Sequence, residues 1–206
     1  MYAVINRSLM DKKCKVESTK TLLETPHFDV VVDHCRDFAD KERDYYRTDS
    51  NSSYVMVVPV KINKASQQIS YVMVEQYRHG CGEFCLEFPA GKRDKGESSA
   101  AAAARELKEE TGYESKHLKF CYTQFLSPVR GPSKQAVFLA VVEGEPEQPQ
   151  REETEVGSAM KTVELTADEL HKKVLNNEIT SACSLGALCA VMLSSKQATK
   201  YLEMKE

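Results

Sequence analysis

Three glutamates lie close together near the middle of the chain, at Glu106, Glu109 and Glu110. In a helix, Glu106 and Glu110 stand one turn apart, at positions i and i+4, with Glu109 on the adjoining flank. Three such carboxylates repel one another unless a cation lies among them, and oxygen ligands on a rigid scaffold suit Mg²⁺ or Mn²⁺. The ordinary alternative is a solvated helix whose charges hold no ion. The surrounding residues must therefore distinguish a metal site from a charged surface.

The segment that carries the glutamates is predicted to be a helix from Ser98 onward. A run of consecutive alanines and then Leu107 are strong helix formers, and neither proline nor glycine interrupts them. Gly112 supplies the stop, because glycine readily adopts the left-handed conformation that ends a helix. The three carboxylates are therefore expected on a regular and rigid element.

The residues around this helix have expected supporting roles. Arg105 can reach the middle glutamate by the i,i+4 spacing, and Glu97 can accept backbone N–H groups of the first helical turn. Gly91 and Gly96 let the preceding loop bend sharply and approach a ligand closely. We expect that loop to bring the carbonyl oxygen of Ala90 near the glutamates, as a further ligand for a hard cation.

A divalent cation held in this way suits hydrolysis of a phosphoanhydride. The bound cation would keep open positions for water and for phosphate oxygens. It would neutralise charge on the non-bridging oxygens and lower the pKa of a bound water, so that hydroxide attacks phosphorus. Glu109, or a carboxylate from elsewhere in the chain, would accept the proton.

The complete spacing is more specific than the three glutamates alone. It runs from Gly91 through five residues to Glu97, then through seven residues to Arg-Glu-apolar-X-Glu-Glu-X-Gly-apolar, ending at Tyr113. A chance match at ordinary residue frequencies is on the order of one in a million. At every position this segment resembles the Nudix box of the Nudix hydrolases. Those enzymes hydrolyse a nucleoside diphosphate linked to another moiety.

The resemblance implies a fold and a set of roles. The fold is α/β, a Nudix fold with a mixed β-sheet sandwiched between helices, and this chain adds a small N-terminal β extension. The implied catalytic residues are Glu106, Glu109 and Glu110. The implied metal ligands are the same three glutamates and the Ala90 carbonyl. The implied structural supports are Gly91, Glu97, Arg105 and Gly112.

Residues before the box point to a subgroup. Residues 73–78, Gly80, Gly82 and residues 86–91 resemble the ADP-ribose and nucleotide-sugar pyrophosphatases of the superfamily. In that subgroup the arginine at position 78 binds a substrate phosphate. The alternative is a surface arginine paired with Glu75 or Glu83, since exposed ion pairs are common.

The resemblance implies an Mg²⁺-dependent hydrolase that cleaves ADP-ribose to AMP and ribose 5-phosphate. Pro128 lies where members that prefer ADP-ribose carry proline, whereas residues 131–135 also resemble UDP-sugar pyrophosphatases. UDP-glucose or another nucleoside diphosphate sugar is therefore the alternative substrate. A second alternative is a Nudix-fold module that binds a nucleotide without turnover, although such regulators often lose the glutamates that this chain keeps.

Members of the subgroup are homodimers whose N-terminal strands cross over and lend aromatic residues to the partner's base pocket. Phe28, Tyr45 and Tyr46 are the corresponding aromatics, and stacking a base on such rings contributes about 1–3 kcal/mol. The alternative is that these rings fill the dimer core. The subgroup often takes its general base from the loop before the last strand. Here that base is expected to be Glu155, with Glu152 and Glu153 as the other candidates.

The pattern of apolar residues places the other elements. We expect an N-terminal β extension over residues 1–50 and the main domain over 51–206. A strand at 54–60 contains Pro59, which requires an edge or an irregularity there. A helix over 181–196 is apolar around most of its circumference and is expected to pack deeply. Further strands are expected at 15–23, 28–33, 69–77, 84–88, 118–125, 136–142 and 162–165, with a capped helix from Thr166 to Leu175.

Composition excludes several classes. The formal net charge of −3 gives no footprint for a nucleic-acid duplex. No apolar run approaches the length of a membrane span. The seven cysteines include no Cys-X-X-Cys pair, which favours reduced thiols in a cytoplasmic protein. Cys81 and Cys85 in particular are expected to be packed thiols.

Overall fold

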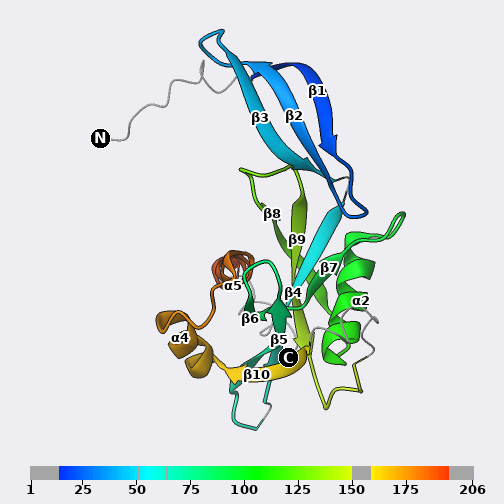
Figure 1. The fold of residues 1–206 in the computed structure, drawn as a ribbon. Coiled ribbons are helices and arrows are strands. Elements are labelled where there is room, and N and C mark those ends of the chain that lie inside the picture. The colour runs from blue at the N-terminus through cyan, green and yellow to red at the C-terminus, as the bar shows by residue number, and fades with distance from the viewer. Residues whose placement is uncertain (1–13, 51, 64, 150–158, 195–206) are drawn as a thin grey trace. The chain divides into compact units, whose positions relative to one another are not determined.

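The fold is given by a computed structural model of the chain, which describes residues 14–50, 52–63, 65–149 and 159–194 (Figure 1). The chain forms two units. The first comprises Met1–Asn51 together with Phe125–Ser133, and the second comprises Ser52–Gln124 together with Lys134–Glu206. The backbone N–H of Thr48 donates to the carbonyl of Arg130 at 2.7 Å. This hydrogen bond links the segment Phe125–Ser133 to the N-terminal strands of the first unit. The domain boundary after residue 50 stays a prediction.

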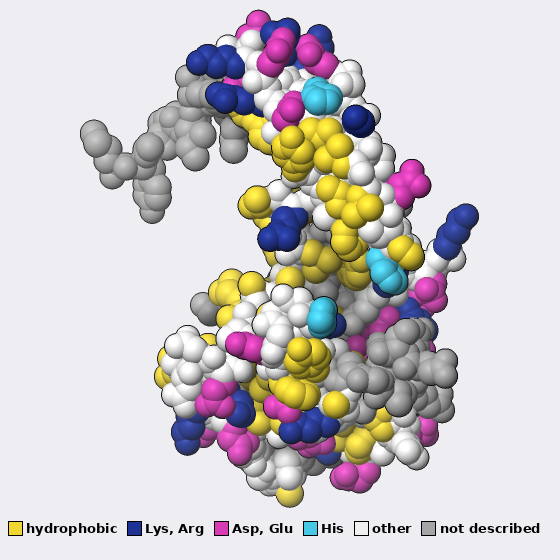
Figure 2. Space-filling view, viewed as in Figure 1, with side chains coloured by type: hydrophobic (Ala, Val, Ile, Leu, Met, Phe, Trp, Pro, Cys, Tyr) yellow, Lys and Arg dark blue, Asp and Glu magenta, His cyan; other side chains and the backbone are white. Residues whose placement is uncertain are grey.

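The first unit is an antiparallel sheet of three strands in the order β1-β2-β3, namely Lys15–Leu23, Asp29–Arg36 and Glu42–Asp49. Asp33 of β2 is buried, and its carboxylate accepts hydrogen bonds from Arg47 Nε and Thr19 Oγ1, each at 2.6 Å. The hydrogen bond from Arg47 lowers the pKa of Asp33. Other parts of this sheet expose apolar side chains, which are visible in Figure 2.

The second unit contains a mixed sheet of seven strands. They are β4 Ser53–Ile62, β5 Ile69–Arg78, β6 Glu83–Glu87, β7 Ala90–Lys92, β8 Leu118–Phe125, β9 Lys134–Val142 and β10 Lys161–Thr166. The order is β10-β5-β4-β9-β8, with β6 paired to β5 and β7 paired to β4. The β4–β9 pair is parallel, whereas β5 is antiparallel to β4, β6 and β10.

Helices cover both faces of this sheet (Figure 1). They are α2 Ser99–Thr111, α4 Ala167–Leu175 and α5 Ala182–Ser194. Val55 and Val57 of β4 pack with Ala103 and Leu107 of α2 in one core cluster. The alternate β4 residues, Met56 and Val58, belong to a second cluster that includes residues of α4 and α5. Alternate side chains of β4 therefore contribute to a hydrophobic core on each face of the sheet. The expected α/β fold, a mixed sheet sandwiched between helices, is confirmed.

Pro59 lies where β4 changes partners. On one side of β4, the ladder with β7 ends at Met56 and the ladder with β5 begins at Val60. On the other side, Pro59 is opposite Ala140 of β9. Because proline has no N–H to donate, a break between two ladders accommodates it.

Two expectations were wrong, one about secondary structure and one about packing. Residues 90–92, expected as a loop, form the short strand β7 because they pair with β4. Helix α5 was expected to pack deeply around most of its circumference. Instead its buried residues are Ser184, Ala187 and Val191, and Leu193 is 77 % exposed. An apolar composition indicates how much surface a helix could bury, and here the neighbouring elements cover one face of α5.

Alanine substitutions at two glycines, Gly112 and Gly144, test how closely the C-terminal end of α2 packs against the segment near Glu147. Gly112 caps α2 with φ 75°, and a Cβ there would lie 1.9 Å from the carbonyl oxygen of Glu147. Gly144 has a similar φ of 78°, and a Cβ there would meet no heavy atom within 4 Å. Both alanine variants should lose about 1–2 kcal/mol to backbone strain. Gly112→Ala should lose more, because the backbone near Glu147 must also move. Urea unfolding of both variants measures the difference, and equal losses would contradict the close packing.

Candidate active site

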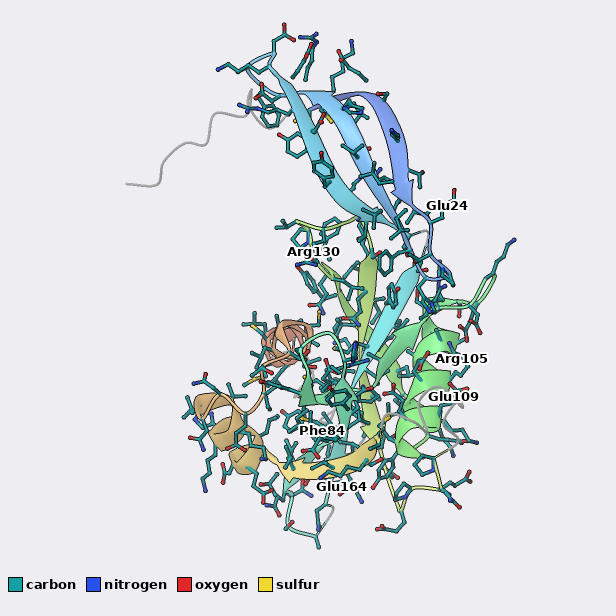
Figure 3. All side chains as sticks on the ribbon, in the orientation of Figure 1. Glu24, Phe84, Arg105, Glu109, Arg130 and Glu164 are labelled. Atoms are coloured by element: carbon teal, nitrogen blue, oxygen red, sulfur yellow. The ribbon has the colours of Figure 1, made fainter. Side chains whose placement is uncertain are left out.

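Helix α2 carries the three glutamates as the sequence predicts. It begins after the N-cap Ser98, whose hydroxyl accepts from the N–H of Ala101 at 3.1 Å, and it ends at the left-handed Gly112. Glu106 is 5 % exposed and Glu110 is 1 % exposed. Glu109 lies on the more exposed flank with Arg105, as Figure 3 shows. Two of the three carboxylates are therefore buried on one face of the helix.

Strand β7 lies directly against these carboxylates. The N–H of Ala90 donates to Glu110 Oε2 at 3.1 Å. A Cβ on Gly91 would lie 2.1 Å from Glu106 Oε1 and 2.3 Å from Glu106 Oε2. The carboxylate of Glu106 therefore occupies the space that any larger residue at position 91 would fill. The expected role of Gly91, close approach to a ligand, stays a prediction, and its observed close approach is to the Glu106 side chain.

Arg105 connects the carboxylates to the loop before the helix. Its Nη1 donates to Glu106 Oε1 at 2.8 Å and to Glu109 Oε2 at 2.9 Å. Its Nε lies 3.2 Å from Glu97 Oε1, and its Nη2 donates to the carbonyl of Lys92 at 2.9 Å. The hydrogen bond with Arg105 lowers the pKa of Glu97 and raises that of Arg105 itself. The guanidinium thereby holds helix, loop and β7 together.

Glu97 differs from its expected contacts. We expected it to accept N–H groups of the first helical turn, but Ser98 caps that turn. The Glu97 carboxylate instead accepts from the N–H of Asp94 at 3.0 Å and from Arg105. Its support of the site therefore passes through Arg105.

Three further hydrogen bonds, made by Ser184 and Tyr113, position the site, and sequence reasoning missed them. Ser184 of α5 is buried, and its hydroxyl accepts from the N–H of Phe88 at 3.1 Å, just before β7. Tyr113, which follows α2, hydrogen-bonds through its hydroxyl to Glu164 of β10 and to Lys61 Nζ of β4 at 2.8 Å. The partners in each hydrogen bond lie far apart in sequence, so no local sequence pattern predicts these contacts.

Arg78 lies at the end of β5 and is exposed. Its Nε pairs with Glu87 Oε2 at 2.7 Å. Glu75, one of the partners considered from sequence, pairs instead with Lys161 at 2.6 Å. The partner of Arg78 is therefore Glu87, the last residue of β6. The phosphate-binding role of Arg78 stays a prediction.

The remaining expected site residues belong to other parts of the chain than the second unit's described elements. Phe28, Tyr45 and Tyr46 are exposed residues of the first unit. Glu152, Glu153 and Glu155 lie outside the described residues. The general base and the base-stacking rings therefore stay predictions.

Two kinds of feature are absent from the parts of the chain that the structure describes. In those parts, no three or more histidine, cysteine, aspartate or glutamate side chains are arranged so that they could hold a metal ion as they stand. In the same parts, no helix has the length and apolar character needed to cross a membrane.

Comparison with known proteins finds similarity to pyrophosphatases that are named for ADP-linked substrates. The chain is 45 % identical over 67 residues to the ADP-sugar pyrophosphatase of Mus musculus, covering 32 % of this chain and 30 % of that protein. It is 31 % identical over 139 residues to the ADP-ribose pyrophosphatase of Bacillus subtilis, covering 66 % of each. The match to the mouse protein thus spans less than a third of its length.

A solved structure, a crystal structure of an ADP compounds hydrolase, superimposes with a TM-score of 0.75. It covers 91 % of this chain and 96 % of that one at 24 % identity, which supports the fold. The model of the NUDIX domain matches residues 53–179, more than half of the chain and the whole of the segment from β4 to α4. Because this family model covers more than half of the chain, including helix α2 with its three glutamates, the chain belongs to the NUDIX domain family.

Proposed function

We propose that this chain hydrolyses the pyrophosphate bond of ADP-ribose, giving AMP and ribose 5-phosphate, with Mg²⁺ or Mn²⁺ as the cofactor. The observation that carries the proposal is the row of carboxylates on α2, two of them buried against the backbone of β7. The names of the mouse and Bacillus subtilis relatives, an ADP-sugar and an ADP-ribose pyrophosphatase, support this substrate over UDP-glucose.

The donor types present suit a hard divalent cation, and the side chains described would have to shift to gather around it. The donors at α2 are carboxylate oxygens, which Mg²⁺ and Mn²⁺ prefer. Gly91 leaves the space in which the carboxylate of Glu106 lies. When bound, the cation would neutralise phosphate charge and lower the pKa of a bound water. Glu106 and Glu110 would hold it, with Glu109 as the third candidate ligand and Ala90 as the backbone ligand expected from sequence.

The other residues would orient the substrate and move the proton. Arg105 holds Glu106 and Glu109 in place through hydrogen bonds of 2.8 and 2.9 Å. Arg78 would receive a phosphate of the substrate, in exchange for or beside its contact with Glu87. Glu155, or Glu109 in its absence, would accept the proton from the attacking water.

The active protein is proposed to be a homodimer. The exposed rings of Phe28, Tyr45 and Tyr46 on the first unit support this, because exposed aromatic side chains mark surfaces that bind a partner or a ligand. In the dimer these rings would stack on the adenine base or fill the subunit interface.

Replacing Gly91 tests the space beside Glu106. In Gly91→Ala the new methyl group would meet the far end of a flexible side chain, so the fold should survive while the Glu106 carboxylate is displaced. We expect Mn²⁺ affinity, measured by isothermal titration calorimetry, to fall by about 10-fold or more. Gly80→Ala is the matched control, since a Cβ there would meet nothing within 4 Å. Equal affinities in the two variants would remove Gly91 from the metal site.

Replacing Glu110 tests the catalytic proposal. Glutamine keeps an oxygen that can accept from the N–H of Ala90 but loses the charge that a cation needs. With Mg²⁺ and ADP-ribose, kcat of Glu110→Gln should fall by about 100-fold or more, with an unchanged melting temperature. Glu114→Gln is the control, because Glu114 is an exposed partner of Lys108. Turnover of ADP-ribose at the wild-type rate by the Glu110 variant would refute the proposal, as would faster turnover of UDP-glucose than of ADP-ribose by the wild type.

A further inference from the structure

Two cysteine sulfur atoms lie in contact on the hairpin that carries Arg78. Cys81 is exposed in the turn between β5 and β6, and Cys85 is a buried residue of β6 that is 8 % exposed. Their Sγ atoms are 3.6 Å apart, and both residues are free thiols. A disulfide bond needs about 2.05 Å between the sulfurs. Modest side-chain rotation and a small shift of the turn would supply that change.

The turn can move without unpairing the hairpin. Cβ atoms on Gly80 and Gly82 would meet nothing within 4 Å, so space surrounds the turn backbone. Cys85 is opposite Gln76 in the β5–β6 ladder, and the ladder continues to the pair of Arg78 with Glu83. Bringing Cys81 closer to Cys85 therefore requires movement of the turn, while Cys85 stays in place in the β5–β6 ladder.

The same turn is anchored on Arg78. The backbone N–H groups of Cys81 and Gly82 donate to the carbonyl of Arg78 at 3.2 and 2.9 Å. The Cys81 thiol lies 3.4 Å from that carbonyl as a third donor. A change in the bonding of Cys81 therefore acts directly on the backbone of Arg78, whose side chain pairs with Glu87.

We propose that Cys81 and Cys85 are a site of reversible oxidation by hydroperoxides, at which an intrachain disulfide forms and weakens substrate capture through Arg78. The effect on capture rests on the proposed function, whereas the formation of the disulfide does not.

The chemistry balances in two steps. The sulfur of Cys81 attacks the hydroperoxide, the O–O bond breaks, and Cys81 becomes a sulfenic acid while the alcohol or water leaves. The sulfur of Cys85 then attacks the Cys81 sulfur, the S–O bond breaks, and water leaves with the proton of the Cys85 thiol. The two thiols lose two electrons in total, and the peroxide oxygens gain them.

Solvent exposure determines which of the two cysteines reacts first with the oxidant. Cys81 is the thiol that solvent and oxidant reach, while burial, with the neighbouring Cys81 as the next cause, raises the pKa of Cys85 to about 11. Cys85 therefore stays protonated and unreactive toward solutes until a sulfenic acid forms beside it. Its role is to resolve the oxidised Cys81.

The experiment treats the full-length protein with hydrogen peroxide, removes the peroxide, blocks the remaining thiols under denaturing conditions and digests with trypsin. Cleavage after Arg78 and after Lys92 places both cysteines on one peptide, residues 79–92. We expect that peptide to be unalkylated and lighter by two hydrogens, and dithiothreitol should restore both thiols. Cys81→Ser should block the change, whereas Cys189→Ser, which removes an exposed cysteine of α5, should not.

Kinetics on the same samples test the effect on Arg78. The KM for ADP-ribose should rise about threefold or more on oxidation, with kcat within about twofold, and dithiothreitol should reverse the change. Peptide 79–92 that keeps two alkylated thiols, a disulfide between two chains, or a KM that oxidation leaves unchanged would each overturn the proposal. If neither form hydrolyses ADP-ribose, the proposed function and the effect on capture both fail, and the peptide still reports on the disulfide.

Discussion

Two carboxylates buried one helical turn apart constrain the whole second unit. Two unit charges about 6 Å apart repel by about 3 kcal/mol at an effective dielectric constant of about 20. Burial adds a desolvation cost to each charge. The structure offsets part of these costs with Arg105 on Glu106 and with the Ala90 N–H on Glu110. A helix that carries such a cluster is suited to a divalent cation, which would reduce the repulsion further.

The scaffold meets this constraint by fixing α2 at several points. Leu107 and Ala103 pack with β4 residues, which fixes the face that α2 turns toward the sheet. Tyr113, hydrogen-bonded to β4 and β10 residues, fixes its C-terminal end. On the opposite face of the sheet, Ser184 holds the backbone before β7. Helix and strand are therefore positioned independently and meet where Gly91 leaves space for Glu106.

Local features of this arrangement were predictable from sequence. The alanine run, Ser98 and Gly112 determine α2 through propensity and capping, which act within a few residues. The capping box at Thr166 and Glu169 begins α4 for the same reason. The spacing of glycines, glutamates and arginine then indicates the family, because each residue type meets a separate geometric need.

Features that depend on distant partners were not predictable. Strand β7 exists because residues 90–92 pair with β4, which their own composition does not indicate. The hydroxyl of Ser184 meets the N–H of Phe88 across 96 positions of sequence. The exposed side of α5 reflects how its neighbours are arranged. Arg78 pairs with Glu87 although the β5–β6 ladder places Glu83 opposite Arg78, so strand register alone does not give this pair.

The proposed function requires that the α2 carboxylates bind a divalent metal ion. Anomalous diffraction from a crystal grown with Mn²⁺ and a non-hydrolysable ADP-ribose analogue tests it most directly. We expect an anomalous peak bonded to carboxylate oxygens of Glu106 and Glu110, with analogue phosphate oxygens as further ligands. A bound analogue with no Mn²⁺ at these carboxylates, or with Mn²⁺ bonded only elsewhere, would contradict it.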